Sequence, residues 1–425
     1  MKTKSLIVII LLSSIFSLNA QQIRGISGDT NWFSHWTNFT PATTTYKDAN
    51  QILTGVIDKD LKLTKNNTYK LIGTVYVTNK AVLTIEPGTV IRGDKESCGT
   101  LVITKGCKII AEGTVAEPIV FTSNSSNLMR KPGDWGGIII LGEAPINKIG
   151  GISFLDFNLD PAVSYYGGEN PNSNSGILKY VRIEYSGHKI NALKELNGLS
   201  LGGVGNGTKF DFIQISFSND DSFESYGGDV NFNHLISYRA TDDDFDFTQG
   251  VQCTISNSIA IRNPFSSDIS GSRCFEIDSY DKLENTDITK KLTKITANNM
   301  TMINTEDNNQ GLVREAVYIK EKSYFNINNS IIDGFSSCVL LENKIGAFPA
   351  NLAKINIQGV QVNRCAGIVL SESPNYNSEL SAWYNSDTFS LELTKSNSSE
   401  LFIQTDVKNS PDFRTKSTNP IVSLK

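Results

Sequence analysis

Short runs of β-branched and aromatic residues, separated by Gly, Pro and Asn, dominate the hydrophobic pattern of the chain. Between about residues 69 and 120 these runs include TVYV, LTIEPGTVIRG, LVITKGCKIIAEG and PIVFTSN. They are too short for helices and rich in Val, Ile and Thr, which is typical of β-strands. The pattern therefore predicts many short strands joined by tight turns.

One part of this pattern repeats at a constant offset of 22 residues. KFDFIQISFSNDDSFESYGG (209–228) aligns with NFNHLISYRATDDDFDFTQG (231–250), so that Phe210 falls on Phe232 and Asp221 on Asp243. A strand-rich period of about 20 residues indicates a solenoid, and the regular Leu and Asn positions of a leucine-rich repeat do not occur. The repeat predicts an all-β parallel β-helix over residues 52–370, with Phe210 and Phe232 stacked inside it.

The beginning of the chain has the pattern of a secretory signal peptide. Lys2 and Lys4 precede the apolar run LIVIILL, and a small residue, Ala20, ends the segment over residues 1–20. The run is too short to span a bilayer, and no Cys lies at the junction for lipid attachment. We expect an exported protein, secreted or held at the cell surface or in the periplasm, that is neither a lipoprotein nor anchored by a transmembrane segment.

Residues 21–51 and 371–425 flank the predicted coil. Trp32 and Trp36 of the segment NWFSHW precede the repeats, where they are expected to plug the open end of the coil. The polar tail from residue 371 onward is expected to wrap around the coil or to cap its other end.

Six motifs occur in order over about residues 52–278: LTIEPGTVIRGDK, KIIAEGTVAEPIVFTS, PGDWGGIIILGEAPIN, SGILKYVRIEYSGH, LNGLSLGGVGNGT and HLISYRATDDDFDF. Together they resemble a family of exported β-helix proteins from Bacteroidetes. The resemblance implies a right-handed parallel β-helix of the pectin-lyase-like type, located at or beyond the outer membrane. It implies no particular activity.

Acidic residues are concentrated in one part of an otherwise balanced chain. The whole chain carries a net charge of −5, which argues against nucleic acid as a partner. Between Asn219 and Gly250, eight acids and one base, Arg239, give a local net charge of −7. Because the repeat offset equals one coil, the Asp pairs of the two copies are expected about 5 Å apart. The eight acids are Asp220, Asp221, Glu224, Asp229, Asp242, Asp243, Asp244 and Asp246.

Three interpretations of this acidic cluster are open. The carboxylates could form a solvated stack of turns in which some of them cap backbone N–H groups. They could hold Ca²⁺, which prefers several carboxylate and carbonyl oxygens; the candidate ligands are Asp220, Asp221, Asp242, Asp243, Asp244 and Asp246. They could also cleave a polysaccharide, since such reactions use paired carboxyl groups; the catalytic candidates are Asp221, Asp242 and Asp243.

The catalytic interpretation has a template. The cluster resembles, in residue types and spacing, the Asn-x-Asp and Asp-pair motifs of polygalacturonase-type β-helix enzymes, although their Gly-His-Gly and Arg-x-Lys motifs do not occur. Pectate-lyase-type enzymes pair Ca²⁺ with an Arg base, for which Arg262 or Arg273 could serve.

Two functions therefore compete. The favoured one is a non-catalytic protein that binds a glycan or another surface component, with a structural Ca²⁺ as an option. Its ligand-binding candidates are Asp220, Asp221, Glu224 and Arg239. The alternative is a polysaccharide lyase or glycoside hydrolase that acts at residues 219–250. A groove lined with basic and aromatic residues beside the acids would favour the enzyme, whereas a flat, self-satisfied Asp ladder would favour the binder.

Six cysteines in an exported chain permit disulfides. Cys253 and Cys274 are 21 residues apart, and Cys338 and Cys365 are 27 apart, each close to the length of one coil. Residues stacked on adjacent coils have Cα atoms about 5 Å apart, which is within the range of a disulfide. These two pairs are the disulfide candidates, and buried free thiols are the alternative.

Overall fold

The computed structural model describes residues 24–416, apart from 193, 264, 266, 268–270, 281, 306–311, 346–347, 374–376 and 385–388. The expected signal peptide (1–20) lies outside the described residues, so it stays a prediction. Among the described residues, no helix is both long enough and apolar enough to cross a membrane.

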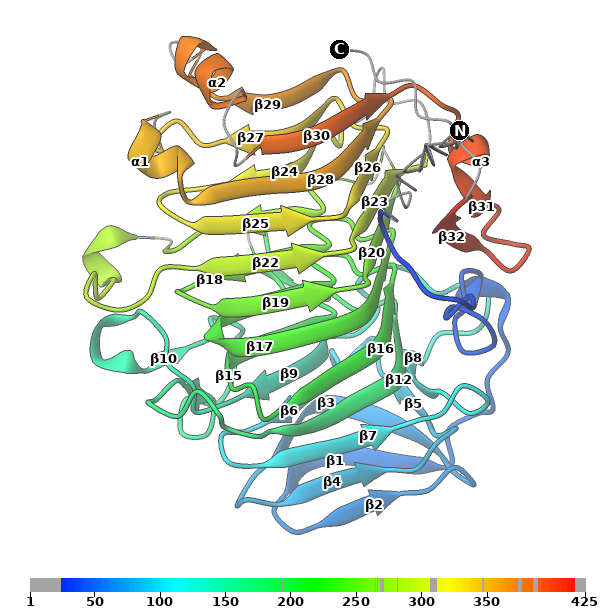
Figure 1. Cartoon of the computed structure of the whole chain (residues 1–425). Coiled ribbons are helices and arrows are strands. Elements are labelled where there is room, and N and C mark those ends of the chain that lie inside the picture. The colour runs from blue at the N-terminus through cyan, green and yellow to red at the C-terminus, as the bar shows by residue number, and fades with distance from the viewer. Residues whose placement is uncertain are drawn as a thin grey trace, which may run out of the picture.

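Parallel strands wind into a long coil, and 26 strands form one continuous sheet (Figure 1). In chain order the strands are β1 (Gln51–Ile57), β2 (Leu61–Leu63), β3 (Thr68–Val77), β4 (Val82–Ile85), β5 (Val90–Gly93), β6 (Thr100–Ile103), β7 (Lys108–Glu112), β8 (Ile119–Ser123), β9 (Gly137–Leu141), β10 (Ser153–Phe154), β11 (Tyr165–Tyr166), β12 (Gly176–Glu184), β13 (Lys189–Asn191), β14 (Lys194–Glu195), β15 (Leu199–Val204), β16 (Lys209–Ser216), β17 (Phe223–Tyr238), β18 (Phe245–Thr248), β19 (Gln252–Ser256), β20 (Ile259–Arg262), β21 (Phe275–Ile277), β22 (Lys294–Asn298), β23 (Thr301–Asn304), β24 (Glu315–Ile319), β25 (Tyr324–Asn328), β26 (Ile331–Asp333), β27 (Ser337–Leu341), β28 (Ile355–Asn363), β29 (Gly367–Ser371), β30 (Phe389–Thr394), β31 (Phe402–Gln404) and β32 (Asp412–Thr415). The helices are α1 (Pro349–Leu352), α2 (Asn377–Tyr384) and α3 (Ser398–Leu401), with short 3₁₀ turns at Pro41–Thr43, Ile149–Gly151 and Leu283–Asn285.

Each coil runs along three faces, which we call the front, side and back faces. In Figure 1 the front strands, such as β22 and β25, point right and the back strands, such as β27 and β29, point left, while the chain climbs from bottom to top. This combination makes the coil right-handed, and the predicted fold class, a parallel β-helix, is confirmed. Long strands turn the corners, so that β17 pairs with β18 on the back face, β19 on the front face and β20 on the side face.

The corner between the front and side faces uses one residue in the left-handed region of each coil. In successive coils these residues include His234, Asn257, Asn299 and Asn329, with φ between 48° and 53°. Asn tolerates this conformation better than most residues. The Asn299 side-chain amide also donates to Asn257 Oδ1 at 3.3 Å, so this bend is held from coil to coil.

Columns of apolar side chains fill the inside of the coil. Phe210 and Phe232 are paired in register, their ring centroids lie 5.3 Å apart, and both are buried, which confirms the predicted inner stack. On the back face Phe223, Phe245 and Phe275 form a second column, with centroids 5.4 and 5.1 Å apart. The register therefore stacks like residues on top of one another, and each is separated from the next by the rise of one coil, about 4.8 Å.

The C-terminal part of the coil extends further than predicted. Strand β30 pairs in parallel with β28, so the sheet continues to Thr394 rather than ending near residue 370. Helix α2 lies at the top of the coil in Figure 1, and its Leu380 and Trp383 join the inner core. These two side chains cover the inner core at this end of the coil.

The expectation that Trp32 and Trp36 plug the open end is wrong. Trp36 is fully buried and Trp32 partly buried against the outer surface of the side face, beside side chains such as Ile236 and Ile259. The C-terminal β31–β32 pair returns to the same surface (Figure 1). The ring centroids of Phe413 and Phe33 lie 6.1 Å apart there. The side-face strands are apolar on both faces, so their outer surface needs a cover of its own.

The structure separates one of the two predicted cysteine pairs and brings the other together. All six thiols are free. Cys253 stacks on Ile295, so its coil is 42 residues long (295 − 253), and Cys274 lies on the back face of that same coil. The Cys253–Cys274 pairing is therefore wrong. By contrast, Cys338 and Cys365 lie close enough to interact, and their interaction raises the pKa of Cys338 and lowers that of Cys365.

We predict that only the second pair can be oxidised without moving the coil. Peptide mapping under non-reducing conditions, with alkylation before unfolding, should find any disulfide at Cys338–Cys365 and free thiols at Cys253 and Cys274. A Cys253–Cys274 disulfide would contradict the register of the front face.

Candidate functional site

Two acidic turns lie one above the other where the chain enters the back face. The first turn precedes β17 and the second precedes β18, and these strands pair Phe223 with Phe245 and Glu224 with Asp246. The same register places Asp221 beside Asp243, whose backbone N–H donates to Asp221 Oδ1 at 2.9 Å. The column continues into the next coil, where Asp246 pairs with Glu276 of β21. The 22-residue repeat thus stacks acid on acid.

A cleft of about 490 Å³ opens over this column. Its walls come from two insertions in the coil, one that carries β10 and β11 and one that carries β13 and β14. An ion pair between Lys194 and Asp156 joins the two insertions. The floor carries five carboxyl groups of the acidic turns and strands: Asp220, Asp221, Glu224, Asp242 and Asp246.

Aromatic and basic side chains line the cleft beside the acids. Phe154 is 54% exposed on the β10 wall, while Tyr166 is buried and donates through its hydroxyl to Gln249 Oε1 at 2.9 Å. Tyr166 fits because Gly202 faces it: a Cβ there would lie 2.7 Å from the Tyr166 ring. Lys148 and Lys194 are the two lysines of the lining, against seven carboxyl groups, so negative charge is in excess.

Burial and mutual repulsion change the ionisation of these acids. Burial raises the pKa of Glu224 to about 8, although hydrogen bonds from Tyr226 and Asn197 oppose this rise. Burial, followed by the charge of Asp220, raises the pKa of Asp221 well above its usual range. Burial and Glu224 do the same to the pKa of Asp246. Glu224 is therefore protonated at neutral pH unless a cation replaces its proton.

The acids of the next coil have basic partners. Glu276 forms an ion pair with Arg273 at 3.0 Å and a second one with Lys320. Burial raises the pKa of Asp278 to about 7, which Lys320 opposes. Glu224 and Asp246, by contrast, make no ion pair with a basic side chain in the part of the chain that the structure describes, and both line the cleft.

Two of the residues predicted for this site lie elsewhere. Asp244 is turned into the coil, where it is fully buried and paired with the equally buried Arg262 at 2.8 Å. It cannot serve as a ligand for a cation in the cleft. Arg239 lies at the corner after β17, where its guanidinium packs on the Tyr238 ring, 5.4 Å from the centroid. It is not part of the cleft.

The two arginines considered as lyase bases are also engaged in ion pairs. Arg262 is buried with Asp244, and Arg273 binds Glu276 and, at 2.8 Å, Glu315. The solvated-turn interpretation fails as well for Asp221 and Asp243, because both are at least 95% buried. Its one correct element is that these two carboxylates accept backbone N–H groups.

The geometry also permits a cation. Within each of three groups, one oxygen from every carboxylate lies within 4.8 Å of the others. One oxygen of Asp246, Oδ1, is buried and accepts no hydrogen bond from the part of the chain that the structure describes. Hard cations prefer such clustered carboxylate oxygens. The three groups are Asp220–Asp221–Asp242, Asp221–Glu224–Asp246 and Asp243–Asp246–Glu276.

The sequence repeat could not reveal the walls of the cleft. Phe154, Phe157 and Tyr166 lie in the insertion between β9 and β12, and Lys194 lies in the one between β12 and β15. The signal available in the sequence was the interruption of the period itself, since long insertions in a solenoid form loops on one side of it.

The chain belongs to the family of pectate-lyase-like β-helix domains, whose model matches residues 55–401. The sequence matches no curated protein. This family assignment agrees with the strand pairing and fixes the superfold.

The solved structures that the chain matches include the following two. One is the enzymatically active domain of tailspike protein 2 of bacteriophage CBA120, with 13% identity over 77% of this chain and 41% of that chain, and a TM-score of 0.25. Another is the catalytic domain of a GH87 α-1,3-glucanase in complex with tetrasaccharides, with 10% identity over 81% of this chain and 63% of that chain, and a TM-score of 0.26. The chain thus spans less than two thirds of either structure.

The raised pKa values predict an unusual dependence of stability on pH. The folded protein holds protons on Glu224 and Asp278 up to pH values of about 8 and about 7, whereas unfolded Glu and Asp lose them near pH 4. The folded state therefore binds more protons between these limits, and the free energy of unfolding falls as the pH rises. In the presence of chelator, the melting temperature should drop by at least about 3 °C from pH 5 to pH 9.

Glu224→Gln should reduce this slope, because the amide does not titrate and only the contribution of groups such as Asp278 remains. Glu284→Gln, at an exposed position, is the matched control and should leave it unchanged. A melting temperature that rises with pH in chelator would contradict the assignment.

Proposed function

We propose that this chain is an exported protein that binds a polysaccharide in the acidic cleft and hydrolyses one of its glycosidic bonds there. The observation that carries the proposal is the cleft itself, in which carboxyl groups from successive coils face aromatic walls. A flat and self-satisfied ladder of acids would favour a binding protein without catalysis. The open, aromatic-lined cleft instead favours the hydrolase over the non-catalytic binder.

The arrangement supplies the two roles that glycoside hydrolysis needs, a carboxylic acid and a carboxylate. Glu224 lines the cleft and holds its proton at neutral pH, so it would donate that proton to the glycosidic oxygen as the C–O bond breaks. Asp242, half-buried on the neighbouring coil, would accept a proton from the water that bonds to the anomeric carbon. Asp221 and Asp243, which hold the turns together, would position these groups.

The pairing of arginines argues against a lyase. A lyase of the pectate type needs a free base near the acids, and both Arg262 and Arg273 are engaged in ion pairs. A hydrolase needs no such group.

A second candidate is a binding protein in which Ca²⁺ joins the glycan to the acids. The clustered oxygens of Asp221, Glu224 and Asp246 and the unpartnered Asp246 Oδ1 favour it. In that case the carboxylates would be ionised, and the cation would replace the proton that the hydrolase needs on Glu224.

We predict that the purified protein releases reducing ends from at least one member of a polysaccharide panel. Glu224→Gln and Asp242→Asn should each lower the rate at least about 100-fold, since each removes one acid–base function. Glu284→Gln should retain the wild-type rate. Binding without any released product would overturn the hydrolase and leave the second candidate.

Chelation gives a separate test of the cation. If Ca²⁺ binds the folded protein alone, a concentration 100 times its dissociation constant should add about 2.7 kcal/mol to the free energy of unfolding. The melting temperature should then fall with chelator and recover with Ca²⁺, and Asp246→Asn should remove this response. Identical melting curves with Ca²⁺ and with chelator would exclude the second candidate.

A further inference from the structure

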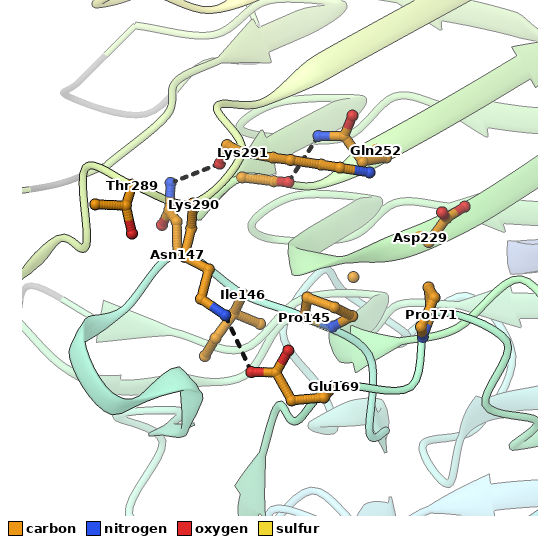
Figure 2. A pocket seen from close by; sticks show the side chains of 12 residues that line it. Pro145, Ile146, Asn147, Glu169, Pro171, Asp229, Gln252, Thr289, Lys290 and Lys291 are labelled. Carbon is orange, nitrogen blue, oxygen red and sulfur yellow. Dashed lines mark hydrogen bonds and ion pairs between the residues drawn. The ribbon is translucent and has the colours of Figure 1, made fainter.

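A second hollow, of about 280 Å³, lies next to the acidic cleft. Figure 2 shows its floor of Pro145 and Ile146, with Asp229 on one side and Lys291 reaching across. The volume is at the lower end of the range for small-molecule sites, about 300–1,000 Å³. It suits a ligand the size of one sugar ring.

The hollow and the cleft are neighbours along three segments. Tyr226 lines the cleft and Gly228 lines the hollow, Gln249 lines the cleft and Gly250 the hollow, and Lys148 lines the cleft while Asn147 lines the hollow. At about 3.3 Å per residue, one or two residues separate them by roughly 3–7 Å. A glycan whose linked rings fill the cleft could therefore extend by one further ring into the hollow.

A bend in β17 makes this placement possible. Gly227 and Gly228 both have positive φ, 67° and 95°, which turns the strand from the back face toward the front face. A side chain at Gly227 would collide with Ile146, 2.4 Å from its Cβ. Glu224 thus faces the cleft, and Asp229 faces the hollow around the corner.

The charged side chains that line the hollow differ in whether they form ion pairs. Lys290 is paired with Glu169 at 3.0 Å, the contact drawn as a dashed line in Figure 2. Lys291 and Asp229, in contrast, make no ion pair with any residue that the structure describes. A carboxylate that can accept from hydroxyls and an ammonium that can donate to them, over an apolar floor, match the polar edge and the C–H face of a sugar.

The wall of the hollow is preformed. The Asn147 amide donates to the Ser279 carbonyl at 2.7 Å, and the Asn147 backbone N–H donates to Gln249 at 3.1 Å. Asp287 in turn donates its N–H to the Asn147 carbonyl at 2.7 Å. These bonds tie the wall to two neighbouring coils, so a ligand would meet it with little reorganisation.

We propose that this hollow is a carbohydrate subsite, which holds one sugar residue of the same glycan chain whose next residues lie in the acidic cleft. The inference rests on the proposed function, because it takes the ligand of the cleft to be a glycan. It adds that Asp229 and Lys291 recognise the hydroxyls of one further residue.

The test uses oligosaccharides two to six residues long, prepared from galacturonan, galactan, α-1,3-glucan and β-1,3-glucan, with binding measured by calorimetry. For the series that binds, affinity should increase from the disaccharide to longer members. Asp229→Asn and Lys291→Ala should each lower the affinity of the longer members about tenfold, the effect of losing one hydrogen bond to a charged group. The affinity of the disaccharide should not change.

Lys282→Ala, at an exposed position before the same loop, is the matched control and should change nothing. If Glu224→Gln abolishes hydrolysis while the Asp229 and Lys291 variants bind every length like the wild type, the subsite is overturned and the proposed function stands. If the wild type neither binds nor cleaves any member of the four series, the proposed function fails and the subsite fails with it.

Discussion

Parallel pairing in register between successive coils is the constraint on which the rest of this structure depends. It places each side chain about 4.8 Å from its equivalent in the next coil, whatever the chemistry of that side chain. For Phe223, Phe245 and Phe275 the result is a continuous core, and for Asn257 and Asn299 it is a hydrogen-bonded corner. For Glu224, Asp246 and Glu276 the same register brings together groups that repel. The same stacking therefore stabilises columns of apolar or amide side chains and destabilises columns of acidic ones.

The structure offsets that penalty everywhere except at the cleft. Arg262 balances Asp244 inside the coil, and Arg273 and Lys320 balance Glu276. Glu224 and Asp246 have no basic partner among the residues described, and burial raises the pKa of both carboxyl groups. Removing a charge from water without pairing it is costly, so an arrangement that serves stability alone would replace these acids. Local conflicts of this kind in an otherwise consistent fold are expected at functional sites.

The sequence predicted which residues stack on one another where the coils have their regular length, and it predicted them wrongly where a coil is longer. The offset of 22 residues holds from β16 through β18, so the stacking of Phe210 on Phe232 and of Asp221 on Asp243 could be predicted. The coil that begins at Cys253 is almost twice as long, and the interval to Cys274 therefore covers only part of it. Likewise, the walls of the cleft come from insertions without a repeat, and the cover formed by Trp36 depends on an outer apolar surface that becomes visible only once the faces are assigned.

The division between coil and insertions also bears on the direction of a bound polymer. A bare coil presents its columns along its axis, which suggests a ligand that lies parallel to that axis. Here the cleft and the hollow lie on either side of the bend in β17, the cleft at Tyr226 and the hollow at Asp229. They are therefore arranged across the axis of the coil. The insertion that bears Phe154 adds an aromatic wall beside the acidic column. A glycan that occupies both the cleft and the hollow would thus lie parallel to the strands. Its path would be set by the Gly227–Gly228 bend and by the insertions rather than by the repeat.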